Sequence, residues 1–286
     1  MPGVEIDCVV CGSGDRRPFR RRDSYKIVRC AGCGLRYLSP QPAPAQLTDL
    51  YTEEYYVSVD SRERGYDGYV TEAENWRRTF RDRLGDLPAM PGKLLDVGAA
   101  TGFFVEQARV VGWDAVGVEP SEWASAYARD ELGVDVRTGT LEEMRFPDGT
   151  FDVVALWEVI EHLPDPLVTL AEIRRVLKPR GRLVLSTPDA GSLAARLSGR
   201  WWLGWRKVPE HLFFFDRQNL DRLLVGAGFE PVRHRYASLS VSAGFVVERA
   251  MSFLGLPRRW RAPAWLARRS IRINPGYDLL VDARRV

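Results

Sequence analysis

Apolar residues follow two alternating patterns along the middle of the chain: short continuous runs, and longer stretches with helical spacing. Leu94 to Val97 is a short apolar run, and Phe103 to Val111 then carries apolar residues at the spacing of an amphipathic helix. A second run, Ala115 to Val118, begins after Gly112. The pattern predicts a strand, a crossover helix and a second strand, which together form a βαβ unit.

The same alternation continues toward the C-terminus. Glu122 to Leu132 predicts a helix, and Phe151 to Trp157 predicts a buried strand. A further helix, Leu167 to Leu177, leads through a turn at Lys178 to Gly181 into the strand Arg182 to Ser186. Repeated units of this kind predict an α/β fold with a doubly wound, Rossmann-like sheet.

The last part of the chain departs from this alternation. Pro231 to Tyr236 and Tyr277 to Ala283 predict two antiparallel strands that lie side by side and complete a seven-stranded sheet. Between them, Val241 to Ile273 predicts an inserted helical hairpin with helices at Phe245 to Leu254 and Ala264 to Ile271. The arginine and tryptophan residues of this insertion are Arg258, Arg259, Trp260, Arg261, Trp265, Arg268 and Arg269. Such a mixture could form the solvated face of a lid, bind an anionic or amphiphilic substrate, or contact a membrane surface.

Length and composition are those of a large globular protein. The chain has 286 residues, of which 45% are hydrophobic, so it can bury a large core. Its formal net charge is +3. It contains no apolar run of about 18 residues and no secretory-signal pattern, so we expect a cytoplasmic protein. Residues 51–195 hold 16 basic and 26 acidic side chains, whereas residues 196–286 hold 17 and 7. A basic C-terminal third therefore follows an acidic middle.

The four cysteines all lie within the first 33 residues. They form two C-x-x-C pairs, Cys8 with Cys11 and Cys30 with Cys33, separated by 18 residues, which is the spacing of a zinc ribbon. Four thiolates with no open position suit a tetrahedral, structural Zn²⁺. Two disulfides or a redox pair are the competing interpretations. Both fit a cytoplasmic chain less well, because that compartment keeps thiols reduced.

Three prolines at positions 40–44 indicate a stiff, extended linker after the cysteines. We therefore predict a zinc ribbon with its linker at residues 1–44. The α/β core, preceded by a tyrosine-rich cap segment, takes residues 45–240. The helical insertion and the final strand of the sheet take residues 241–286.

The turn after the first predicted strand carries the residues of a nucleotide-binding site. Asp96 precedes the sequence Gly98-Ala-Ala-Thr-Gly102, and Glu119 ends the next strand, where a carboxylate accepts hydrogen bonds from ribose hydroxyls. The stretch resembles motif I, acid-x-Gly-x-Gly-x-Gly, of the class I S-adenosylmethionine (SAM) methyltransferases, with Ala100 at the middle glycine position. The alternative is an αβ turn that uses glycine only for tightness.

A second stretch carries the same resemblance. Glu158 to Pro166 is similar to the E-V-x-E-H-x-x-D-P segment of SAM methyltransferases that act on quinones, sugars and natural products. We expect Glu158 and His162 to lie one helical turn apart and to face the cofactor end of the cleft. The cofactor-binding residues implied by the resemblance are Asp96, Gly98, Ala100, Gly102, Phe103, Glu119, Pro120, Thr140, Leu141, Trp157, Glu158 and His162.

Two segments are expected to border the acceptor substrate. In the resembled family an E-H-x-x-x-F block lies at the substrate mouth, and such a block begins here with His211 as its histidine. His211 is our candidate for proton abstraction and His162 the second, but His211 could equally hydrogen-bond backbone groups and shape the loop. Aromatic residues from Trp201 to Phe215 are expected to shape an apolar substrate cavity. The tyrosines expected to cap both substrates, or else to pack on the core, are Tyr51, Tyr55, Tyr56, Tyr66 and Tyr69.

These observations favour a SAM-dependent methyltransferase acting on a small or medium-sized metabolite such as a sugar, natural product or lipid-like acceptor, with O-methylation preferred. One alternative is an RNA methyltransferase whose ribbon binds nucleic acid. Its local support is the basic run Arg16, Arg17, Arg20, Arg21 and Arg22. Near-neutral total charge and the lack of an Asn-Pro-Pro-aromatic tetrapeptide argue against a nucleic-acid partner. The other alternative, a SAM-binding scaffold without activity, fits poorly with intact Asp96, Glu119 and Glu158 to His162.

Overall fold

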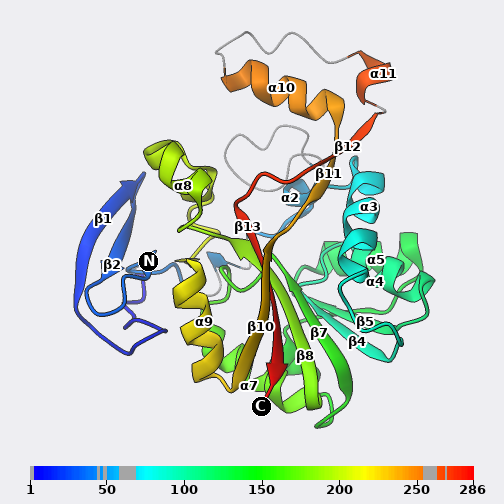
Figure 1. Cartoon of the computed structure of the whole chain (residues 1–286), viewed down its shortest axis with the longest axis horizontal. Coiled ribbons are helices and arrows are strands. Elements are labelled where there is room, and N and C mark those ends of the chain that lie inside the picture. The colour runs from blue at the N-terminus through cyan, green and yellow to red at the C-terminus, as the bar shows by residue number, and fades with distance from the viewer. Residues whose placement is uncertain (1–2, 44–45, 48–49, 58–68, 254–262, 268) are drawn as a thin grey trace.

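A seven-stranded sheet forms the centre of the molecule (Figure 1). The structure is a computed structural model, and it describes residues 3–43, 46–47, 50–57, 69–253, 263–267 and 269–286. The strands of the sheet are β4 (Lys93–Val97), β5 (Asp114–Glu119), β6 (Val136–Thr138), β7 (Phe151–Trp157), β8 (Leu177–Pro188), β10 (Phe229–Tyr236) and β13 (Asp278–Arg285). Their order across the sheet is β10-β13-β8-β7-β4-β5-β6. The predicted α/β fold with a seven-stranded sheet is confirmed.

The strands β4 to β8 pair in parallel, and β13 runs antiparallel to both of its neighbours. In the predicted pairing of the last strand, Pro231 lies opposite Ala283 and Tyr236 opposite Leu279. Because the carboxyl ends of parallel strands meet at one edge of a sheet, the turns after β4, β5 and β7 lie together, where α/β folds bind their ligands.

Helices cover both faces of this sheet and bury its apolar side chains. Phe80 of α3, Phe104 of α4 and Ala124 of α5 belong to one buried cluster, whereas Leu170 of α7 and Leu220 of α9 belong to another. The helices are α2 (Glu53–Val57), α3 (Ala73–Leu84), α4 (Phe103–Val110), α5 (Glu122–Leu132), α6 (Leu141–Met144), α7 (Pro166–Val176), α8 (Leu193–Ser198), α9 (Arg217–Gly226), α10 (Ala243–Phe253) and α11 (Ala264–Ala267), with short 3₁₀ turns η1 (Gly199–Trp201) and η2 (Leu203–Arg206). The core therefore lies in two layers, as expected for strands that are apolar on both faces.

The cysteine-rich N-terminus folds into a small antiparallel sheet with strand order β1-β2-β3-β9. These strands are β1 (Arg16–Arg22), β2 (Tyr25–Cys30), β3 (Arg36–Leu38) and β9 (Phe213–Phe214). β9 comes from the α/β core, and it pairs with β3 so that Arg36 lies opposite Phe214 and Tyr37 opposite Phe213. The N–H of Leu38 also donates to the carbonyl of Leu212 at 2.8 Å. The ribbon thus shares a sheet with the core.

The C-terminal insertion differs from the expected helical hairpin. Its first helix, α10, matches the prediction, but the second, α11, is only four residues long. The last two residues of the predicted second helix, Ser270 and Ile271, belong instead to a strand, β12 (Ser270–Ile273), which pairs antiparallel with β11 (Leu239–Ser242). The sequence Ser-Ile-Arg-Ile alternates polar and apolar residues, a period of two that favours a strand. Predictions for Tyr66, Leu254, Arg258, Arg259, Trp260, Arg261 and Arg268 concern residues outside the described ranges.

The predicted turn at Lys178 to Gly181 lies within β8. The register between β7 and β8 shifts here, because Phe151 lies opposite Leu177 and Val153 opposite Arg182. Arg180 has a φ of 62°, so the extra residues form a bulge in the strand instead of ending it. Within the part of the chain that is described, no helix is long and apolar enough to cross a membrane.

Candidate functional site

The turn after β4 has the sharp backbone that close approach of a ligand requires. Gly98, Ala100 and Gly102 have positive φ values of 73°, 48° and 83°. A Cβ on Gly98 would lie 2.5 Å from Val159 Cγ2, and one on Gly102 would lie 2.8 Å from Ala128 Cβ, so both positions require glycine. Ala100 adopts the left-handed conformation despite its methyl group. The substitution at the middle glycine position therefore leaves the turn intact.

Glu119 reaches this turn from the neighbouring strand β5. Its carboxylate accepts hydrogen bonds from the N–H groups of Ala100 and Ser121, both at 2.9 Å, and the Tyr56 hydroxyl donates to it at 3.5 Å. The side chain is buried, which raises its pKa, while the two backbone N–H groups oppose the rise. A carboxylate has about four lone-pair sites. Glu119 can therefore accept further hydrogen bonds from a ligand.

Asp96 at the end of β4 is a buried acid with an unused acceptor. Its side chain is 1% exposed, and Oδ1 has no hydrogen-bond partner among the described residues. Burial and the charge of Glu119 raise its pKa well above the usual value, and Arg83 opposes the rise. Trp157 Nε1 and Thr101 Oγ1 are likewise buried without a partner in the described chain. Because buried polar groups are normally hydrogen-bonded, these atoms are candidates to contact a polar ligand at the turn.

The other residues implied by the resemblance lie in varied environments around the same sheet edge. Phe103 begins α4 and is fully buried, and Leu141 begins α6 and is 1% exposed. Thr140 caps α6 and forms a capping box with Glu143, and Pro120 is exposed. Phe103 and Leu141 therefore pack in the core, whereas Thr140 and Pro120 lie at its surface.

A buried charged network beside the turn was missed by the sequence analysis. Arg83 of α3 donates to Ser186 Oγ at 3.0 Å and to Asp278 Oδ2 at 3.1 Å, and Ser186 Oγ donates to Glu158 Oε1 at 2.9 Å. The Arg83 guanidinium lies 4.6 Å from the centre of the Trp157 ring. Burial and the charge of Asp278 raise the pKa of Glu158 well above the usual value. No local pattern could reveal this network, because its members come from four distant elements.

The expectation that Glu158 and His162 share a helical turn is wrong. Glu158 has a φ of 56°, and the residues after β7 form a turn in which the His162 N–H donates to the Val159 carbonyl at 2.9 Å. A left-handed residue at 158 prevents a right-handed helix from starting there. Glu158 bonds to Ser186, whereas His162 Nδ1 lies 3.1 Å from the Tyr51 hydroxyl. The two side chains therefore serve different parts of the site.

His162, His211 and Glu161 form a second polar cluster. The two imidazole rings lie 4.7 Å apart at an interplanar angle of 83°, and the nitrogen and carboxylate oxygen atoms of the three side chains lie within 4.8 Å of one another. Glu161 Oε2 accepts from Thr187 Oγ1 at 2.9 Å, and Oε1 accepts no hydrogen bond from a described residue. Two imidazoles and a carboxylate can move a proton, and the same atoms could hold a divalent metal ion.

Burial sets the charge of these three side chains. It lowers the pKa of His211 well below the usual value, and His162 and Lys207 lower it further. Burial, with Lys207, lowers the pKa of His162 to about 3, and burial raises the pKa of Glu161 to about 8. Near pH 7 both imidazoles are therefore neutral, which is the form that accepts a proton.

The backbone fixes this cluster next to the glycine turn. The N–H groups of Leu212 and Phe213 both donate to the Glu161 carbonyl, at 2.8 and 3.2 Å, so the His211 segment lies against the segment after β7. The Val159 side chain, from that same segment, fills the space beside Gly98. A ligand bound at the turn would therefore lie close to the two histidines.

The tyrosine-rich segment contacts both parts of the site. The Tyr51 carbonyl accepts a hydrogen bond from Ser121 Oγ at 2.8 Å, and the Tyr51 hydroxyl lies 3.1 Å from His162 Nδ1. Tyr55, Tyr56 and Tyr69 are buried. The segment thus joins the Glu119 end of the site to the histidine end.

The tryptophans before His211 do not share one environment. Trp202 and Trp205 are 4% and 6% exposed, and the Trp205 ring lies 4.8 Å from the ring of Phe214. Trp201 is 67% exposed. Trp201 therefore does not contribute to a buried apolar surface.

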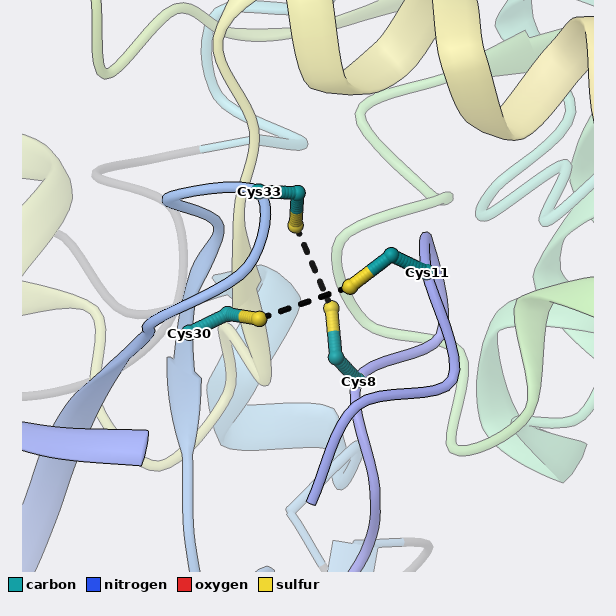
Figure 2. Close-up of side chains that lie close together, drawn as sticks. All are labelled: Cys8, Cys11, Cys30 and Cys33. Carbon is teal, nitrogen blue, oxygen red and sulfur yellow. Dashed lines mark hydrogen bonds between the residues drawn. The ribbon is translucent and has the colours of Figure 1, made fainter. Parts of the chain in front are cut away.

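The four cysteine side chains point toward one another from two turns, as Figure 2 shows. The sulfur atoms of Cys8 and Cys33 lie 3.4 Å apart, those of Cys11 and Cys30 lie 3.5 Å apart, and all four lie within 4.8 Å of one another. A disulfide needs about 2.05 Å, so these are not disulfides. A tetrahedral zinc with Zn–S bonds of about 2.3 Å places its sulfurs about 3.8 Å apart. The donor set and its spacing fit zinc.

Comparison with known proteins identifies the domain that surrounds this site. Residues 69–234 match the family model described as a methyltransferase domain. The chain is 33% identical over 162 residues to a ubiquinone biosynthesis O-methyltransferase of Cereibacter sphaeroides, a match that covers 53% of this chain and 66% of that protein. It is 34% identical over 126 residues to the protein of the same name from Bradyrhizobium diazoefficiens, which covers 42% of this chain and 49% of that protein. The chain thus spans just under two thirds of the first relative and about half of the second.

Solved structures share the fold. A SAM-dependent methyltransferase from Archaeoglobus fulgidus superimposes with a TM-score of 0.52 at 19% identity, covering 78% of this chain and 96% of that chain. A protein from Pyrococcus horikoshii gives a TM-score of 0.52 at 17% identity, covering 82% and 97%. At these identities the likeness concerns the fold alone.

Proposed function

We propose a reaction for this chain, which belongs to the class I SAM-dependent methyltransferases. It transfers the methyl group of SAM to a hydroxyl oxygen of a small or medium-sized metabolite. The observation that carries the choice of oxygen is the cluster of Glu161, His162 and His211. A hydroxyl must lose its proton during transfer, whereas an amine that is already neutral need not. The names of the relatives, ubiquinone biosynthesis O-methyltransferases, support the same acceptor atom.

The glycine turn and its acids are the proposed SAM site. Glu119 would accept hydrogen bonds from the ribose hydroxyls, with its remaining lone pairs free for them. Asp96 Oδ1, which has no partner among the described residues, would accept a hydrogen bond from the ammonium group at the methionine end of SAM. Gly98 and Gly102 let the turn pack closely against Val159 and Ala128, which fixes the backbone that would face the ligand.

His211 is the proposed general base. SAM supplies an electrophilic methyl group, and the acceptor oxygen must approach it in line with the carbon–sulfur bond. His211 is held by β9 and Glu161, and its neutral imidazole would take the proton from the acceptor hydroxyl as the oxygen–carbon bond forms. Glu161, once ionised above its pKa of about 8, would stabilise the resulting imidazolium, because the two groups lie within 4.8 Å of each other.

Transfer of labelled methyl from SAM to a panel of phenols, sugars and other hydroxylated small molecules tests this function. We expect His211→Ala to lower kcat by about 100-fold or more while SAM affinity stays at the wild-type value. His234→Ala is the matched control, because His234 pairs with Asp221 away from the cluster. Methylation of RNA but of no small molecule would contradict the proposal, and unchanged kcat in His211→Ala would remove the base.

We also propose one structural Zn²⁺ on Cys8, Cys11, Cys30 and Cys33. The convergence of the four sulfurs within 4.8 Å of one another supports it, since four cysteine sulfurs are the donor set of a tetrahedral, structural zinc. A metal bound there contributes folding energy to a segment with little core of its own.

A cytoplasmic location and contact of the C-terminal insertion with a membrane stay predictions. Trp265 of α11 is 64% exposed and Arg269 is exposed, which fits either a lid or a surface contact.

A further inference from the structure

Residues 190–209, which lie between β8 and His211, carry positive charge and no negative charge. Residues 190–209 contain Arg196, Arg200, Arg206 and Lys207 but no aspartate or glutamate. The nearest acids on either side, Asp189 and Glu210, are 3% and 1% exposed. The surface of this segment is therefore purely cationic.

The same segment exposes large apolar side chains. Leu193 and Leu197 of α8 and Trp201 of η1 are 69%, 79% and 67% exposed. Leu193 and Leu197 are four residues apart on α8, so they lie on neighbouring turns of one helix face. Gly199, with a φ of 50°, ends α8, and Trp201 follows in the 3₁₀ turn η1 as the third exposed apolar side chain of the segment. Single exposed apolar residues need no explanation, but an exposed row of them marks an interaction surface.

The opposite side of the segment is firmly anchored, so this exposure is not the result of a loose loop. Ala195 and Trp202 are 6% and 4% exposed, and Trp205 Nε1 donates to the Gly199 carbonyl at 3.1 Å. Ser192 caps α8 by accepting from the Ala195 N–H at 3.1 Å. The fold thus holds the apolar row outward.

Basic residues surround the row. Arg196, Arg200 and Arg206 are exposed, and Arg20 of β1 donates to the Arg200 carbonyl at 3.5 Å. Figure 1 shows α8 at the end of the molecule that carries β1 and β2, whose Arg17 and Arg21 are also exposed. The ribbon therefore extends the cationic surface around α8.

We propose that this face, Leu193, Leu197 and Trp201 with Arg196 and Arg200, docks on the surface of an anionic lipid bilayer. An apolar row bordered by arginines matches the layered chemistry of such a surface, with anionic headgroups outside and acyl chains beneath. Pairing with a second copy of the chain would bring the same cations face to face. The segment leads directly into the His211 loop, so docking would place the proposed acceptor site near the lipid.

Flotation of the full chain with vesicles tests the inference. We expect binding to vesicles of equal parts phosphatidylcholine and phosphatidylglycerol, and little binding to phosphatidylcholine alone. Arg196→Gln with Arg200→Gln should weaken binding about 25-fold, because each arginine near an anionic surface contributes about fivefold. High salt should also weaken binding to these vesicles, because it screens the charges.

The apolar row is tested by a triple variant, Leu193→Ser, Leu197→Ser and Trp201→Ser, which should lose at least about tenfold in vesicle affinity. The matched control is Leu167→Ser with Val168→Ser on α7, which are 41% and 53% exposed and should bind as wild type does. SAM affinity and methylation of water-soluble acceptors should be unchanged in the triple variant, so failure of docking and failure of the proposed reaction can be told apart.

Three results would overturn the inference. They are the absence of binding to anionic vesicles, wild-type binding by the triple variant, and a concentration-dependent dimer that the triple variant abolishes. The last result would assign the face to a second copy of the chain.

Discussion

Glu119→Gln separates the role of this carboxylate in the fold from its role in binding SAM. Glutamine keeps the size of the side chain but places an amide N–H₂ where one oxygen accepts from a backbone N–H at 2.9 Å. One buried N–H then faces another donor, which costs about 1–3 kcal/mol. Burial raises the pKa of Glu119, which means that the buried charge is itself unfavourable, so the neutral glutamine offsets part of this loss of stability. We therefore expect the free energy of unfolding in urea to fall by about 1 kcal/mol.

The loss of SAM affinity should be larger. Hydrogen bonds from ribose hydroxyls to a charged group contribute about 1.5–3 kcal/mol each. Replacing the carboxylate should therefore weaken binding by about 10- to 150-fold in calorimetry. Glu122→Gln is the control, because Glu122 is exposed in the first turn of α5. If Glu119→Gln folds and binds SAM with wild-type affinity, the assignment of the ribose site is refuted.

Two further predictions concern acid–base chemistry and metal. The kcat of the wild type should rise about tenfold as pH increases through about 8, because Glu161, whose pKa burial raises to about 8, becomes charged and stabilises protonated His211. Glu161→Gln should flatten this part of the pH–rate profile, and an unchanged profile would exclude the carboxylate as its source. Protein purified without added zinc should contain about one equivalent. Cys33→Ser should lower this zinc content. Titration of the wild-type thiols should find no reactive cysteine until a chelator is added.

The strands and helices that were predicted best are those with strong local signals. Phe151 to Trp157 is a strand with the predicted ends, since its apolar run is bounded by turn residues. α5 also has its predicted ends, because Ser121 caps its start and Gly133, with a φ of 64°, ends it. The prediction of helix at Ser270 and Ile271 failed because the four residues of β12 carry only a weak period, and pairing with β11 decides between helix and strand.

The site residues likewise divide into those with a local sequence signal and those brought together only by the fold. The glycine turn and Glu119 form one βαβ unit, so residues only about 20 positions apart in sequence suffice to place them. Arg83 and Asp278 are 195 positions apart, and Tyr51 and His162 are 111 apart, yet both pairs are hydrogen-bonded. Only the tertiary packing of helices, strands and connecting segments brings these pairs together. A single sequence contains no local signal for such contacts.

The ribbon and the proposed base are linked by one short path of backbone hydrogen bonds. The Cys30 N–H donates to the Leu35 carbonyl at 2.8 Å, immediately before β3 begins. β3 pairs with β9, and β9 begins two residues after His211. Folding of the cysteine cluster therefore determines where one edge of the His211 segment lies, and the Glu161 carbonyl determines the other. The proposed zinc ribbon would therefore help to position the proposed base, which would give its cysteines a structural role beside the methyltransferase core that does not require nucleic acid.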